Sequence, residues 1–142
     1  MRLEGATGGC LCGAVRFTYS GELGGSLGRI TACLCDQCRK AQGFAAAVGP
    51  ADARGFSIVQ GQDQVREFES SPGKMRAFCG CCGSPLYSRL DNRPDAVRLR
   101  LGAFDKLPQN VAVEAVIFSG EAPAWTRLEE ALHYPAREPE RT

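Results

Sequence analysis

The chain has 142 residues, with 17 basic and 16 acidic side chains and a net charge of +1 at pH 7. This length is sufficient for one domain with its own core, and we expect that domain over residues 1–135 and a polar tail over 136–142. The near-neutral charge lacks the basic excess typical of nucleic-acid-binding or membrane-surface proteins, so we expect neither kind of partner.

The N-terminal stretch has no apolar segment of the secretory type, and no run approaches the roughly 20 apolar residues of a membrane span. We therefore expect a cytoplasmic protein. Thiols stay reduced in that compartment and lasting disulfides are rare there. Eight cysteines in such a chain indicate metal binding rather than disulfide bonds.

Alternating apolar residues predict strands in most of the chain. The clearest period of two lies in residues 96–104, where Val97 and Leu99 oppose Arg98 and Arg100. Further strands are predicted over 13–19, 55–61, around 65–68, and over 85–90. The nearly continuous apolar run at 111–119 predicts a strand that is buried on both faces, and clusters of Gly and Pro between the segments indicate turns.

Helix is expected in two short places. Residues 36–43 fit one or two turns, with Asp36 as N-cap and Gly43 as the stop signal. Residues 123–134 carry apolar side chains at helical spacing, among them Trp125, which we expect in the core. The sequence therefore predicts a mainly β protein with short helices.

Four cysteines form two chelating pairs. Cys10 and Cys12 lead into the strand at 13–19, and residues two apart in a strand point to the same side. Cys79 and Cys82 form a C-x-x-C turn. The glycine that follows at position 83 can adopt the positive φ that such a turn often needs. Two such pairs make a closed Cys₄ zinc site of the structural kind.

Three further cysteines lie in the stretch CLCDQC, as Cys33, Cys35 and Cys38. Their sulfurs can converge on one metal ion and leave its fourth position open, as in catalytic zinc sites. Three thiolates damp the Lewis acidity of zinc and favour a soft fourth ligand. A thiol in that position loses its proton. We therefore expect a small thiol as substrate, held as a thiolate on a second zinc.

Other interpretations remain open. Cys81 can complete the CLCDQC group, which would make both zinc sites closed and the protein a non-catalytic, zinc-stapled scaffold. The chain can instead carry glutathione or another thiol without accelerating a reaction. Disulfides, or a metal-free redox trio, are weaker alternatives.

A few other side chains allow two interpretations. His133 is the sole histidine, and we expect it on the surface rather than on a metal. Arg39 and Lys40 follow the trio, and Arg76 and Arg89 flank the C-x-x-C turn. Each of these four side chains is either a solvated charge or a partner for a substrate carboxylate.

Three motifs together resemble the glutathione-dependent formaldehyde-activating enzyme family, whose domain is shared with centromere protein V. They read GGCLCGAVRF, CLCDQCRKAQG and RAFCGCCGSPL, and their order and spacing agree with the family over roughly residues 5–135. Two positions depart from it, because Leu34 and Glu114 stand where the family commonly has His.

The resemblance implies an all-β fold of the β-tent type with two zinc ions. It implies that the structural zinc is held by Cys10, Cys12, Cys79 and Cys82, and the catalytic zinc by Cys33, Cys35 and Cys38. The implied activity is that of a carbon–sulfur lyase, which joins glutathione and formaldehyde to S-hydroxymethylglutathione. The exact thiol and aldehyde stay open.

Overall fold

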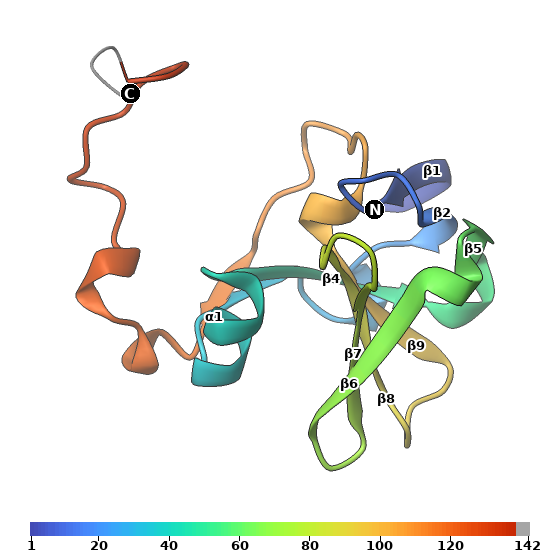
Figure 1. Cartoon of the computed structure of the whole chain (residues 1–142). Helices are drawn as coiled ribbons and strands as arrows, with labels where there is room; N and C mark the ends of the chain where they lie inside the picture. Colours follow the sequence, from blue (N-terminus) through green and yellow to red (C-terminus); the bar gives the residue numbers. More distant parts are fainter. Residues whose placement is uncertain (139–142) are drawn as a thin grey trace.

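The computed structural model describes residues 1–138 and consists of two β-sheets with one α-helix (Figure 1). The smaller sheet has the order β1 (Arg2–Gly9), β2 (Arg16–Glu22) and β5 (Phe56–Gln60). The larger sheet has the order β10 (Ala115–Ile117), β3 (Thr31–Cys33), β4 (Ala46–Asp52), β9 (Ala96–Arg100), β8 (Pro85–Leu90), β7 (Lys74–Cys79) and β6 (Val65–Ser71). Neighbouring strands are antiparallel, except that β10 runs parallel to β3.

The mainly β fold class is confirmed, and each predicted strand segment overlaps an observed strand. Sequence analysis predicted no strand at β1, β3, β4 or β7. The prediction for residues 111–119 was too long, because only Ala115–Ile117 pairs, at the edge of the large sheet. It was also wrong about burial on both faces, since Val116 is 54% exposed. An edge strand has one neighbour and leaves its other side open.

The helix α1 (Asp36–Gln42) matches the first helical prediction, but its N-cap is Cys35 rather than Asp36. The Cys35 backbone is extended and its Sγ accepts a hydrogen bond from the Cys38 N–H at 3.3 Å. The helix ends at Gly43, which has a φ of 83° and donates its N–H to the Arg39 carbonyl. Glycine adopts this left-handed backbone without a steric penalty.

The predicted helix over 123–134 does not form. Among the described residues of the C-terminal segment there are only 3₁₀ turns, at Ser119–Glu121 and Ala124–Thr126. The segment extends away from both sheets (Figure 1), and Trp125 is 56% exposed rather than in the core. A short helix in water is marginal without a surface for its apolar face, which explains the difference.

Four other 3₁₀ turns lie at Gly25–Leu27, Ala53–Gly55, Gln62–Gln64 and Leu101–Ala103. His133 is exposed, as expected, and its Nε2 lies 3.0 Å from the Leu128 carbonyl oxygen. Of the predicted tail at 136–142, residues 139–142 lie outside the described part. No helix within residues 1–138 combines the length and apolar character that crossing a bilayer requires.

The main core lies between the two sheets. Phe17 of β2 packs against Phe56 of β5 and against Phe104, with ring centroids 5.4 Å apart in both pairs. Phe56 in turn meets Tyr87 of the large sheet at 5.1 Å. Such tilted and edge-on aromatic contacts add to the stabilisation that buried area provides. The aromatic chain therefore joins the small sheet to the large one.

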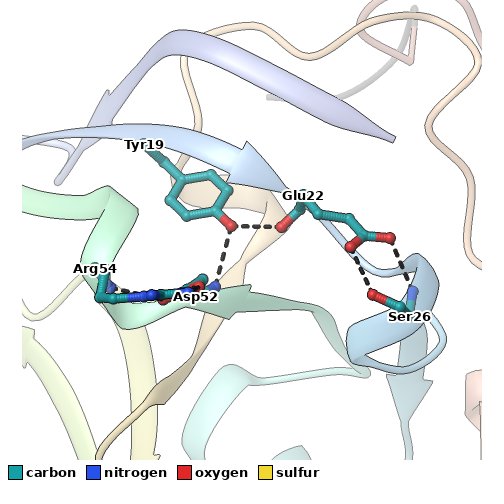
Figure 2. Close-up of polar contacts among 5 residues, drawn as sticks. All are labelled: Tyr19, Glu22, Ser26, Asp52 and Arg54. Carbon is teal, nitrogen blue, oxygen red and sulfur yellow. Dashed lines mark hydrogen bonds and ion pairs between the residues drawn. The ribbon is translucent and has the colours of Figure 1, made fainter.

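Tyr19 is the largest fully buried side chain, and its hydroxyl ties β2 to β4. The hydroxyl donates to the Glu22 carbonyl and accepts from the Asp52 N–H at 3.1 Å (Figure 2). Neighbouring turns are fixed by Glu22, which accepts two hydrogen bonds from Ser26, and by the ion pair of Asp52 with Arg54. Burial raises the pKa of Tyr19, so the hydroxyl stays neutral.

We predict that Tyr19→Phe lowers the free energy of unfolding by about 1–3 kcal/mol, because the partly buried Asp52 N–H loses its acceptor. Tyr134→Phe is the matched control, since Tyr134 is 46% exposed. Urea unfolding followed by circular dichroism measures both. Equal stability of the two variants would show that the hydroxyl contributes nothing.

Candidate metal centres

Cys10, Cys12, Cys79 and Cys82 form the first group, which we call the four-cysteine group. Their sulfurs all lie within 4.8 Å of one another. The Cys10 and Cys12 sulfurs are 3.6 Å apart, and those of Cys12 and Cys79 are 3.9 Å apart. A tetrahedral zinc ion with Zn–S bonds of about 2.3 Å places its sulfurs about 3.8 Å apart. The donor set and its spacing therefore fit a closed, structural zinc site.

Two hairpin turns carry this group. Cys10 and Cys12 lie in the turn between β1 and β2, and not in a strand as we expected. Cys79 ends β7, and Cys82 lies in the turn that leads to β8. Gly83 has a φ of 80° and donates its N–H to the Cys79 carbonyl at 2.8 Å, as the C-x-x-C turn predicted. The two hairpins belong to different sheets, so the group joins them.

Backbone and hydroxyl groups surround these sulfurs. The Val15 N–H donates to Cys10 Sγ at 3.2 Å and the Cys81 N–H donates to Cys79 Sγ at 3.3 Å. The Ser84 hydroxyl lies 3.1 Å from Cys82 Sγ and accepts from the Leu11 N–H, which links the two turns directly. Sequence reasoning missed Ser84, whose signal is its place two residues after a ligand.

The pKa values of Cys82 and Cys12 are shifted in opposite directions. The hydrogen bond with Ser84 lowers the pKa of Cys82 to about 5. A backbone hydrogen bond from Ala14 favours the Cys12 thiolate, but the sulfurs of Cys10 and Cys82 outweigh it and raise the Cys12 pKa to about 12. Without a cation, closely packed thiols cannot all ionise, whereas a bound divalent ion favours four thiolates.

Cys33, Cys35 and Cys38 form the second group, which we call the three-cysteine group. Their sulfurs also lie within 4.8 Å of one another. Cys33 ends β3, Cys35 caps α1 and Cys38 lies in the first turn of that helix. Three soft donors that converge from a strand end and a helix start fit a metal ion with one position left for another ligand.

Arg76 reaches this group from β7 and donates its Nη2 to Cys38 Sγ at 3.6 Å. Burial opposes the ionisation of Cys38, but this hydrogen bond and the other two sulfurs lower its pKa. Cys33 behaves oppositely, because burial and the neighbouring sulfurs raise its pKa to about 12. Cys38 is therefore the thiolate that the protein itself favours.

The edge strand β10 holds the segment that carries the three-cysteine group. Ile117 pairs with Cys33, and its carbonyl accepts the Leu34 N–H at 3.0 Å. Just before β10, Glu114 exchanges two hydrogen bonds with the Ile30 backbone, at 2.8 and 2.9 Å. Glu114 therefore holds the backbone of Ile30, three residues before Cys33. Within the described residues it is not grouped with the sulfurs of the three-cysteine group.

The remaining candidates lie apart from the two groups. Cys81 is exposed and its thiol donates to Gln64 Oε1 at 2.9 Å, so within residues 1–138 it joins neither group. Arg39 pairs with Asp36 at 2.7 Å. Arg89 pairs with Glu67 and Asp91, each at 2.7 Å, and Lys40 is exposed.

A second arginine lies on the side of the sheet that carries Arg76. Arg100 of β9 is buried and donates its Nε to Gln42 Oε1 of α1 at 3.0 Å. Sequence reasoning gave Arg100 no role, although its alternation with Leu99 placed it on a polar face. The burial of that face beside α1 depends on tertiary structure.

Comparison with known proteins decides the family. The family model of the glutathione-dependent formaldehyde-activating enzyme matches residues 5–121. The chain belongs to this family. A crystal structure of a Rhodobacter sphaeroides protein has the same fold, with a TM-score of 0.61 and 19% identity over 78% of this chain and 98% of that chain. No curated protein matches the chain.

We predict that Cys81→Ser retains two zinc ions per chain, whereas Cys79→Ser retains one and melts at a lower temperature. The reason is that Cys79 belongs to the four-cysteine group, whereas the Cys81 thiol donates to Gln64 and belongs to neither group among the described residues. Metal analysis of protein purified under reducing conditions measures the stoichiometry. Loss of one zinc ion from Cys81→Ser would instead make Cys81 a ligand and the second site closed.

Proposed function

We propose that this protein is a zinc-dependent enzyme that joins a small thiol to an aldehyde, with glutathione and formaldehyde as the substrates that family membership favours. The observation that carries the proposal is the three-cysteine group with its three converging sulfurs. Its four-cysteine counterpart would hold a structural zinc ion. The absence of Cys81 from both groups supports the assignment of different roles.

The reaction requires no oxidant or reductant. The thiol sulfur forms a bond to the aldehyde carbon, the carbonyl π bond opens, and the thiol proton ends on the former carbonyl oxygen. Cys33, Cys35 and Cys38 would hold a zinc ion, which would supply a soft position for a sulfur ligand and favour loss of the thiol proton. Breaking the same bond is the lyase direction.

Hydrogen bonds and strand pairing fix the geometry of the three-cysteine group. Cys35 uses its sulfur as helix cap, which fixes its distance from Cys38. Arg76 donates to Cys38 Sγ, which stabilises negative charge on that sulfur. Pairing of β3 with both β4 and β10 keeps Cys33 at a defined register. A preorganised ligand set of this kind does not have to be assembled when the substrate binds.

We predict that the purified protein accelerates the exchange between glutathione, formaldehyde and S-hydroxymethylglutathione, and that Cys35→Ser lowers the catalysed rate by at least about 100-fold. Nuclear magnetic resonance exchange spectroscopy measures the rate. Cys81→Ser is the control, because it removes a thiol outside both groups and should retain the wild-type rate.

Three other outcomes have definite meanings. A Cys35→Ser variant as active as the wild type would contradict the role of the three-cysteine group. Tight glutathione binding without any rate enhancement would identify a thiol carrier instead of an enzyme. Wild-type protein that neither binds glutathione nor changes the exchange rate, while holding two zinc ions, would identify a zinc-stapled scaffold.

A further inference from the structure

The C-terminal segment over residues 122–138, which we call the arm, exposes large apolar side chains. Leu128 is 51% exposed and Leu132 is 82% exposed. Trp125 touches the body of the protein through Phe44, with ring centroids 6.0 Å apart, and is still 56% exposed. Beyond Trp125 the arm runs away from both sheets (Figure 1). Apolar side chains that are exposed together in this way indicate a surface for another protein segment.

The spacing of these side chains fits one face of a helix. Trp125, Leu128 and Leu132, which we call the apolar row, stand at positions i, i+3 and i+7 and turn to the same side of an α-helix. Glu129 lies at the border of that side, because it is four residues after Trp125. Among its described residues the arm holds a single 3₁₀ turn, Ala124–Thr126. A helix of this length becomes stable when its apolar face packs on a groove.

A matching hollow lies on the large sheet, and we call it the aromatic cavity. It has a volume of about 290 Å³, and its walls include Phe68 of β6, Phe78 of β7, Tyr87 of β8 and Ala41 of α1. Phe68 is 63% exposed, so this ring stands at the mouth of the cavity. Hollows with aromatic walls are the usual places where apolar side chains of a partner are buried. The aromatic cavity therefore suits the apolar row of the arm.

The charges of the two surfaces are opposite. Arg76 and Arg100 line the aromatic cavity and are only 8% and 4% exposed. The ion pairs formed within residues 1–138 include neither arginine, and Arg76 Nε and Nη1 are buried there without a hydrogen-bond partner. The arm carries Glu129 and Glu130 beside its apolar row. A carboxylate brought to the cavity would compensate positive charge whose burial is otherwise costly.

We propose that the arm of one copy of this chain docks as a helix into the aromatic cavity of a second copy, with its apolar row on the aromatic walls and Glu129 toward the two arginines. Each copy has one arm and one cavity, so a two-fold arrangement buries both arms at once and closes the assembly. The arm leaves its own body beyond Trp125, which favours the cavity of another copy (Figure 1). This assembly is independent of the reaction proposed at the three-cysteine group.

Trp125 is the single tryptophan of the chain, so its fluorescence reports docking of the arm directly. The full-length protein, purified with its metal, is serially diluted while the emission is recorded and the mass is followed by sedimentation velocity. At high concentration we expect a particle of twice the chain mass and Trp125 emission at short wavelength. On dilution the mass should fall to that of one chain, and the emission should move to longer wavelength in step with it.

Two variants each remove one half of the contact. Leu132→Glu places a charge in the apolar row, and Phe68→Glu places one at the mouth of the cavity; both side chains are exposed in the single chain. Each variant alone should raise the dissociation constant of the dimer at least about tenfold. An equimolar mixture should form dimers more tightly than either variant alone, because the intact arm of the Phe68→Glu chain meets the intact cavity of the Leu132→Glu chain.

Val59→Glu is the control, because Val59 is 61% exposed on β5 and belongs to neither surface. It should keep the wild-type dissociation constant. Glu129→Gln should weaken the dimer at least about threefold and reduce its dependence on salt, because it removes the charge opposite the arginines. Circular dichroism checks that each variant is folded. If Phe68→Glu does not fold, the wild type, Leu132→Glu and Glu129→Gln still decide the question.

Four results would each overturn the proposal. A wild type that stays monomeric with long-wavelength emission has an undocked arm at every concentration. A monomer with short-wavelength emission has its arm on its own body. A dimer that Leu132→Glu and Phe68→Glu leave unchanged is formed by another surface, such as the open edge of β10. A mixture of these two variants that dimerises no better than either alone contradicts the pairing of arm with cavity.

Discussion

The meeting of two hairpin turns at the four-cysteine group is the contact on which the rest of the structure depends. One turn belongs to the small sheet and the other to the large sheet, and about 70 residues separate them in sequence. Bringing such distant segments together has a large entropic cost, and ligation of one ion by both turns would offset part of it. The aromatic contacts and Tyr19 then fix the angle between sheets that are already joined.

The three-cysteine group depends on the joined sheets but shares no sulfur with the four-cysteine group. Its cysteines come from one short segment, so their convergence is local, but the environment around them is assembled from distant strands. Arg76 lies three residues before Cys79 on β7, so the strand that carries a ligand of the first group also carries the arginine at the second. A single strand therefore contributes to both groups.

The sequence predicted best what local geometry determines. The grouping of the seven cysteines followed from their spacing, and the fold class followed from alternation in segments such as 96–104. Strand β4 escaped notice because it contains Gly49 and Pro50. Proline has no backbone N–H to donate. Pro50 is tolerated because β3 pairs only with Ala46–Val48, so no β3 residue lies opposite Pro50. The helix expected at 123–134 and the burial of Arg100 both depended on tertiary packing, which periodicity does not contain.

Because β10 pairs with β3, the surroundings of the three-cysteine group are completed late in the synthesis of the chain. The segment with Cys33 and Cys35 leaves the ribosome early, but its outer neighbour, Ile117, follows more than 80 residues later. Until then the outer edge of β3, which ends at Cys33, is unpaired, and Glu114 is not yet bonded to the Ile30 backbone. The three sulfurs converge locally, but the outer pairing that holds the Cys33 segment forms only when almost the whole chain has been made.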